Sequence, residues 1–136
     1  MEAASTISED SVEMLYQLGY ELYRNGKYSD AEDCFKLLSG HRLEDRRAWM
    51  GLGATYQMQK KHAEAIECYS IAALQEPNDP YVHWHAAQCL HAVKNPIKAL
   101  EALRSALHVA KADPQHAKAV PALEVLEQVW KQGATT

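Results

Sequence analysis

The chain has 136 residues, 47% of them apolar, and a formal net charge of -4 at pH 7. This length indicates one domain that can bury a core, with the composition of an ordinary soluble protein. The acidic balance lacks the basic stripe that phosphate contacts require, so we expect no nucleic-acid partner. No apolar run approaches the ~20 residues that span a bilayer, which predicts no stable membrane insertion.

Residues 1–11 form a short polar segment without the positive region and apolar stretch of a secretory signal. The three cysteines, Cys34, Cys68 and Cys89, are odd in number, widely spaced and without a CxxC pair. Such usage is typical of reduced thiols rather than of a disulfide framework. We therefore expect a cytoplasmic protein.

Residues 12–113 divide into three segments of 34 residues, numbered from Val12, Arg46 and Pro80. Small residues recur at position 8 and position 20 of each segment, and large apolar residues recur at position 24. These residues are Gly19, Gly53 and Ala87; Ala31, Ala65 and Ala99; and Phe35, Tyr69 and Leu103. Small residues let two helices approach closely, and the large ones fill the gaps around them. This period and alternation resemble the tetratricopeptide repeat, a helix pair that buries its apolar face by stacking on its neighbours.

The predicted fold is therefore all-α, with three tetratricopeptide-type helix pairs in a right-handed superhelical stack plus a C-terminal capping helix. In chain order, the first repeat (12–45) carries helices at 12–25 and 28–40. The second repeat (46–79) carries helices at 46–59 and 62–75, and the third (80–113) carries helices at 80–93 and 96–111. Residues 114–132 hold an amphipathic capping helix, expected over 115–132, and residues 133–136 form a tail.

Helix boundaries are marked by specific residues. Asp79, Asn95 and Asp113 each precede a proline, the arrangement of an N-cap followed by proline at the first helical position. Gly26 and Gly40 are expected where helices end. Pro121 either marks the true start of the capping helix or kinks it.

The first helix of each repeat lines the concave side of such a stack, with positions 2, 5, 9, 12 and 13 facing inward. The candidate peptide-binding residues at these positions are Tyr16, Tyr20, Tyr23, Met50, Gln57, Tyr81, Trp84, Gln88 and His91. Aromatic residues and methionine are enriched among interface anchors. The glutamines and the histidine can hydrogen-bond the backbone of an extended peptide. The pattern therefore predicts a groove for an extended apolar segment.

Two alternatives remain open for this stripe. Because Tyr16, Tyr20 and Tyr23 follow helical spacing, part of it can belong to the core. An N-terminal segment or a second subunit can also cover it. The sequence does not predict a clamp for a C-terminal carboxylate, since such clamps carry Lys and Asn at the positions that Tyr16 and Tyr20 occupy here.

Three runs in the chain resemble a known family: LYQLGYELYRNGKYSDAEDCF (15–35), MGLGATYQ (50–57) and WHAAQCL (84–90). They are similar to the class II chaperones of bacterial type III secretion, which escort hydrophobic translocator proteins. The resemblance covers roughly residues 12–112, and the array of Tyr16, Tyr20 and Tyr23 is its most specific element. It implies that the groove binds an N-terminal segment of a translocator, with Tyr16, Tyr20 and Tyr23 lining the pocket, followed by Met50, Gln57, Trp84 and His85.

The same resemblance implies a possible homodimer, although only about ten residues precede the first repeat, where family members carry a longer N-terminal extension. A relative that escorts another secretion component, such as a needle subunit, is the alternative within this class. A tetratricopeptide scaffold that joins two subunits is the alternative from another class.

Enzymatic motifs are absent from the sequence. It has no Gly-rich phosphate loop, nucleophile motif or HExxH, so no catalytic residue and no cofactor is expected. Among the histidines, only His85 shares a helical face with Cys89, and two ligands make a weak site, so no metal is expected.

Overall fold

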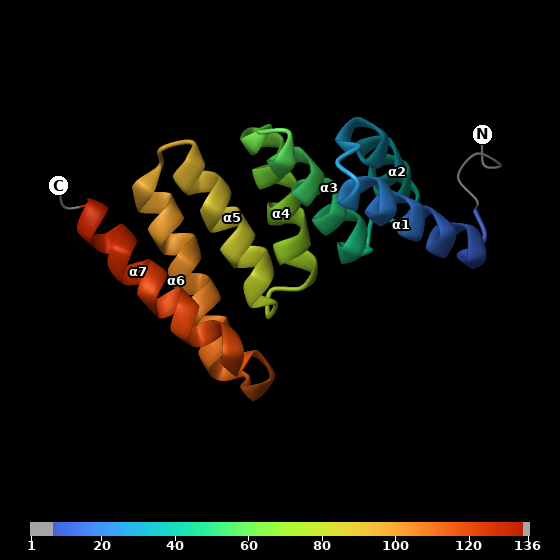
Figure 1. Ribbon diagram of the computed structural model, residues 1–136. Helices are drawn as coiled ribbons and strands as arrows, with labels where there is room; N and C mark the ends of the chain where they lie inside the picture. The colour runs from blue at the N-terminus through green and yellow to red at the C-terminus, as the bar shows by residue number, and fades with distance from the viewer. Residues whose placement is uncertain (1–6, 135–136) are drawn as a thin grey trace.

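The computed structural model describes residues 7–134 of the chain. Its helices are α1 (Glu9–Arg24), α2 (Tyr28–His41), α3 (Arg46–Met58), α4 (His62–Gln75), α5 (Pro80–Ala92), α6 (Pro96–Ala112), the 3-10 helix η2 (Pro114–Ala119) and α7 (Val120–Ala134). Each helix packs against the next along the chain, and Figure 1 shows them side by side in one curved row from N- to C-terminus. The predicted all-α fold of helical repeats is confirmed.

Helix α1 begins three residues before the predicted start at residue 12. The hydroxyl of Ser8 accepts a hydrogen bond of 3.1 Å from the backbone N–H of Ser11 and so caps the helix. Glu9 and Asp10 in the first turn favour the same start, because carboxylates stabilise the positive end of a helix. Residues 9–11 of the predicted polar N-terminal segment are therefore part of helix α1.

The N-caps that precede proline are confirmed in all three places. The Asp79 side chain accepts from the backbone N–H of Tyr81 at the start of α5, and Asn95 accepts from Lys98 at the start of α6. Asp113 accepts from Gln115, but it caps the 3-10 helix η2 rather than an α-helix. The single capping helix over 115–132 is therefore wrong. Helix α7 starts at Val120, with Pro121 in its first turn, where a missing N–H costs nothing.

The turns inside the repeats share one backbone feature. Gly26, Lys60 and Lys94 follow one another at intervals of 34 residues and have positive φ angles of 77°, 62° and 62°. A left-handed residue after the C-cap ends a helix by satisfying its last carbonyls. Gly26 therefore ends α1 as predicted, whereas Gly40 lies inside α2, which runs to His41.

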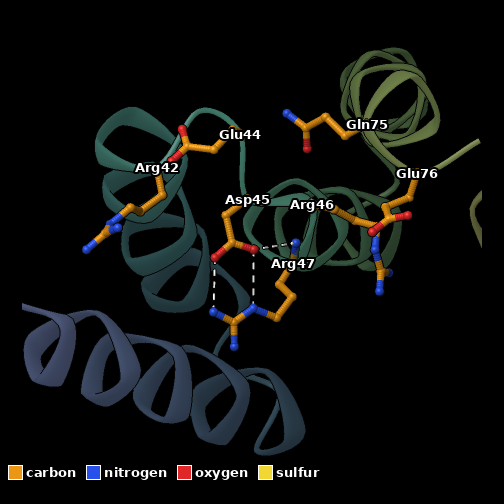
Figure 2. Close-up of a pocket in the computed structure, with 7 residues that line it drawn as sticks. All are labelled: Arg42, Glu44, Asp45, Arg46, Arg47, Gln75 and Glu76. Atoms are coloured by element: carbon orange, nitrogen blue, oxygen red, sulfur yellow. Dashed lines mark hydrogen bonds and ion pairs between the residues drawn. The ribbon is translucent and has the colours of Figure 1, made fainter.

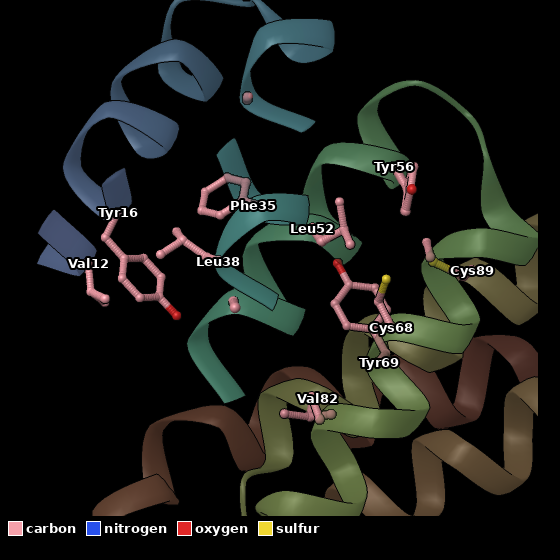
Figure 3. Packing of buried hydrophobic residues seen from close by; sticks show 14 residues of the cluster. Val12, Tyr16, Phe35, Leu38, Leu52, Tyr56, Cys68, Tyr69, Val82 and Cys89 are labelled. Carbon is pink, nitrogen blue, oxygen red and sulfur yellow. The ribbon is translucent and has the colours of Figure 1, made fainter. Parts of the chain in front are cut away.

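The core consists of two clusters of buried residues. The first runs through α1 to α5, and Figure 3 shows Tyr16, Phe35 and Tyr69 among its members. The second joins Ala87 of α5 to Leu103 of α6 and Leu123 of α7. Leu123 is fully buried, so α7 is an integral part of the stack.

The repeated glycines make room for aromatic rings. A Cβ atom on Gly19 would lie 2.9 Å from the Phe35 ring, and one on Gly53 would lie 2.8 Å from the Tyr69 ring. Phe35 and Tyr69 come from the second helix of the same repeats, at position 24. The alternation of small and large residues in the sequence thus corresponds to direct contacts between paired helices. Within the described residues, no helix is long and apolar enough to cross a membrane.

Candidate functional site

The candidate site lies on the first helices of the repeats, α1, α3 and α5. On α1, Tyr20 keeps 37% of its surface exposed, and Tyr23 is half-buried. The Tyr20 ring packs edge-on against Phe35 with 5.1 Å between ring centroids, and Tyr23 packs edge-on against Tyr28 at 5.6 Å. These contacts hold two tyrosine rings with part of their surface open to solvent.

Tyr16 differs from the prediction that its ring is open to a ligand. It is only 4% exposed, and it stacks on Tyr20 with 6.2 Å between centroids. The guanidinium carbon of Arg47 lies 4.2 Å from the Tyr16 ring centroid and covers it. Burial, followed by the nearby carboxylate of Asp45, raises the pKa of the Tyr16 phenol well above its usual range. Tyr16 thus belongs to the core, as the alternative interpretation allowed.

Arg47 is held in place by two carboxylates. Its guanidinium lies 3.0 Å from Asp45 and 3.2 Å from Glu13. The Asp45 carboxylate also accepts from the Arg47 backbone N–H, at the N-terminus of α3. Burial opposes ionisation of Asp45, but its hydrogen bonds from Arg47 prevail and lower the pKa of its carboxyl. The positive charge of Arg47 over the Tyr16 ring is therefore balanced by two carboxylates.

A chain of hydrogen bonds crosses the middle of the site. The Tyr69 hydroxyl donates to Gln57 Oε1 at 2.8 Å, and Gln57 Nε2 donates to Gln88 Oε1 at 3.4 Å. His85 Nδ1 lies 3.3 Å from the same Gln88 oxygen, and the His85 ring stacks on Tyr69. Burial lowers the pKa of His85 and so favours the neutral imidazole, and the contact with Gln88 Oε1 is a hydrogen bond in the tautomer whose Nδ1 carries the proton. The network links α3, α4 and α5.

Helix α5 contributes the aromatic end of the site. Tyr81 is 41% exposed and stacks on the half-buried Trp84, with 6.0 Å between ring centroids. Gln88 and His91 are exposed, and Met50 and Gln57 of α3 are half-buried. The structure therefore leaves eight of the nine predicted residues at least partly accessible, all except Tyr16.

Two aromatic residues beyond the repeats were missed by the prediction. The Trp130 ring of α7 lies parallel to the His91 ring, with 4.3 Å between centroids. His116 of η2 lies edge-on to Tyr81 at 6.3 Å. Trp130 lies at the end of the apolar stripe of α7, and this stripe was visible in the sequence. The residue was not predicted as part of the site because the 34-residue period, from which the site residues were chosen, does not extend to this segment.

A polar hollow borders this aromatic surface at Arg47. Figure 2 shows this hollow of about 450 Å³ at the start of α3. It is lined by Arg42, Glu44, Asp45, Arg46, Arg47, Gln75 and Glu76. Its arginines are already paired, Arg42 with Glu9, Arg46 with Asp79 at 2.9 Å, and Arg47 with Asp45. The hollow is thus an ion-paired contact between repeats, and each arginine among its described lining residues already has a carboxylate partner.

No group of three or more His, Cys, Asp or Glu side chains within residues 7–134 is arranged to hold a metal ion. Cys68 and Cys89 are buried free thiols, and Cys34 is a half-buried one.

The tetratricopeptide-repeat family model matches residues 16–80 and 59–117. The low calcium response locus protein H of Yersinia pestis is 39% identical over 84 residues, which is 62% of this chain and 50% of the Yersinia protein. The chain thus spans about half the length of this curated relative.

Two solved structures align over nearly the whole chain. PcrH of Pseudomonas aeruginosa, in complex with the chaperone-binding region of PopD, has a TM-score of 0.90 and 31% identity, covering 94% of this chain and 96% of PcrH. SycD, the type III secretion translocator chaperone of Yersinia enterocolitica, in an alternative dimer, has a TM-score of 0.88 and 28% identity, covering 95% and 98%. The chain therefore belongs to the tetratricopeptide-repeat family and, within it, to the class II chaperones of type III secretion.

Proposed function

We propose that this protein is a cytoplasmic bacterial chaperone that binds an extended apolar segment of a hydrophobic translocator protein. The translocator stays soluble and unassembled in this complex until it is exported by type III secretion. The observation that carries the proposal is the row of partly exposed aromatic and methionine side chains on α1, α3 and α5. Support comes from PcrH, whose solved complex holds the chaperone-binding region of PopD.

The proposed contact residues are Tyr20, Tyr23, Met50, Gln57, Tyr81, Trp84, Gln88 and His91. Tyr16 acts beneath them as the ring on which Tyr20 stacks. Because Gln88 Oε1 already accepts from Gln57 and His85, the Gln88 amide N–H groups are left to donate to carbonyl groups of the bound segment. Apolar contacts on either side of these donors suit an extended backbone with alternating side chains.

The affinity expected from this surface is moderate. Three apolar anchors that each gain ~1.5–3 kcal/mol on burial must offset the cost of ordering a flexible segment. The remainder corresponds to roughly micromolar binding. Such an affinity suits a chaperone that has to release its client, and the proposed role requires no catalytic residue.

Co-expression with a hydrophobic translocator from the same organism tests this function. We expect the translocator to become soluble and to co-purify with the unaltered chain. The double variant Tyr20→Ala, Met50→Ala should lose the translocator while keeping its helical circular dichroism. Leu74→Ala is a matched control, because Leu74 is 84% exposed on the second helix of a repeat, away from the groove. A soluble needle subunit together with an insoluble translocator would contradict the proposal in favour of the needle-chaperone alternative.

A homodimer is part of the proposal, through the face of α1 that points away from the groove. Met14 and Leu18 are 67% and 50% exposed there, and with Ser11 and Leu15 they line a hollow of about 430 Å³. SycD, a relative of similar fold, forms dimers. Sedimentation of Met14→Glu, Leu18→Glu should show a monomer where the unaltered chain shows a dimer, and an unchanged dimer would place the contact elsewhere.

A further inference from the structure

The segment that follows the third repeat contacts both ends of the groove surface of α5. His116 of η2 lies beside Tyr81, and Trp130 of α7 lies flat against His91, with an angle of 6° between the rings. Tyr81 and His91 are both exposed residues of α5. The groove surface therefore continues past α5 onto elements outside the repeats.

Helix α7 is firmly attached in this position. Leu123 is fully buried, and Leu126 and Trp130 pack against the second core cluster. Two ion pairs join α7 to α6, Arg104 with Glu127 at 3.0 Å and Lys111 with Glu124 at 3.3 Å. Trp130 remains half-buried under these restraints. Its indole is thus presented on a fixed element, as an anchor for a ligand should be.

A second, exposed face of α7 provides a contrast. Val125 and Val129 are 64% and 57% exposed, and neither joins the cluster that Trp130 contacts. Figure 1 shows α7 lying along α6 at the C-terminal end of the stack. Helix α7 follows α6 as α3 follows α2 and α5 follows α4, so it takes the place of a first helix of a further repeat.

We propose that α7 forms a fourth wall of the groove, and that the Trp130–His91 pair binds an apolar side chain at one end of the same translocator segment. This inference rests on the proposed function. The fourth wall is continuous with the aromatic surface of α5, and the side chains at the contact are an indole and an imidazole without a charged partner on their exposed faces among the described residues. An apolar or aromatic side chain is the group that such a surface recognises.

The fourth wall changes the length of segment that the groove can hold. Packed helices lie roughly 10 Å apart, so the intervals from α1 to α7 span on the order of 30 Å. An extended chain rises ~3.3 Å per residue, so about nine residues cover this span. A groove that stopped at α5 would hold only about six residues. Peptide length is therefore a direct measure of where the groove ends.

The experiment uses fluorescence anisotropy with labelled peptides tiled across the N-terminal region of the translocator, alongside the chaperone-binding region of PopD. The shortest tightly bound peptide is then trimmed from either end. We expect trimming at one end to weaken binding about 5- to 30-fold, the usual range for loss of one anchor. Trp130→Leu should cause the same loss with the full peptide and no further loss with the trimmed one. At the other end of the peptide, Tyr20→Ala is the matching variant. It should weaken binding of the full peptide as much as trimming that end does, and it should cause no further loss with the peptide trimmed there.

Two further variants separate binding from packing. His91→Ala removes an exposed ring that packs only on Trp130 among the ring contacts of the described residues, so it should weaken binding while lowering the melting temperature only slightly. Val125→Ala, at an exposed position roughly 140° around α7 from Trp130, should leave the affinity unchanged. Full affinity in both Trp130→Leu and His91→Ala, together with a loss in Tyr20→Ala, would overturn the fourth wall and leave the proposed function intact. Absence of binding for every peptide by the unaltered chain would overturn both.

Discussion

The guanidinium of Arg47 lies over the ring of Tyr16, 4.2 Å from its centroid, and joins α3 of the second repeat to α1 of the first. Asp45 and Glu13 hold the guanidinium from two sides. A cation over an aromatic face at a partly exposed site contributes ~0.5–1 kcal/mol, and exposed ion pairs add little more. This contact holds α1 of the first repeat against α3 of the second repeat at the groove surface.

Arg47→Ala should therefore lower the free energy of unfolding by about 1 kcal/mol, because Tyr16 loses its cover. Urea denaturation measures the change. Arg24→Ala is the control, since within residues 7–134 Arg24 forms an ion pair only with Glu21 three residues earlier, and both side chains are largely exposed. It should change stability by less than about 0.5 kcal/mol. Equal effects of the two substitutions would show that the ring contact contributes nothing.

Gly51 tests the packing between the first two repeats. A Cβ atom there would lie 2.5 Å from the Phe35 ring, and Phe35 is fully buried. Overpacking of this kind costs roughly 1–3 kcal/mol, so Gly51→Ala should lower the melting temperature clearly. Adding Phe35→Leu should recover part of the loss relative to Phe35→Leu alone, because the ring that clashes is gone.

Gly40 is the matched control for Gly51. It also lies inside a helix, but a Cβ atom there would meet nothing within 4 Å. Alanine is favoured over glycine within helices by ~0.5–1 kcal/mol. Gly40→Ala should therefore raise the melting temperature, and a loss of stability at this position would contradict the open space that the structure shows.

Most of the fold was predictable because the 34-residue period reports contacts within each helix pair. Gly53 and Tyr69 are 16 residues apart and touch directly, so their spacing recurs wherever the pair recurs. Asp79 and Asn95 are equally local, since a cap involves only the next two or three residues. The start of α1 was missed because Ser8 caps it outside the repeat frame.

The candidate site was less predictable, because its details depend on contacts between repeats. Tyr16 occupies the same repeat position as the half-buried Met50 and Trp84, yet it is covered by Arg47, which lies 31 residues further along the chain. No local pattern reports which way a long side chain will turn. Trp130 was missed as a groove residue because η2 displaces α7 from the repeat frame, so its register against His91 depends on tertiary packing.

Lys60 and Lys94 carry a conformation that suits glycine. Both have φ of 62° at the place where the first repeat has Gly26. Side chains other than glycine disfavour this region by roughly 1 kcal/mol. Lys60→Gly and Lys94→Gly should each raise the free energy of unfolding by a few tenths to about 1 kcal/mol, measured by urea denaturation. Lys61→Gly is the control, because Lys61 has φ of -90° and gains nothing from glycine.

The buried thiols should make the protein less stable at alkaline pH. Burial raises the pKa of Cys68 to about 12 and that of Cys89 to about 11. Below the usual thiol pKa, which is about 8.5, both thiols are protonated in the folded and unfolded chain, and their contribution to stability is fully present. Above it, only the unfolded chain releases the protons, so stability falls as pH rises from about 8.5 towards about 11, by up to about 1.4 kcal/mol per pH unit for each thiol.

Urea denaturation at about pH 8 and about pH 9.5 measures this loss, below the usual tyrosine pKa of about 10. In the variant Cys68→Ala, Cys89→Ala, the unfolded chain has two fewer protons to release. The variant should be less stable at the lower pH, because both side chains are buried, but its stability should change less between the two pH values. An identical pH dependence in the variant and the unaltered chain would assign the loss of stability to other groups. One such group is the half-buried thiol of Cys34, because burial also raises its pKa.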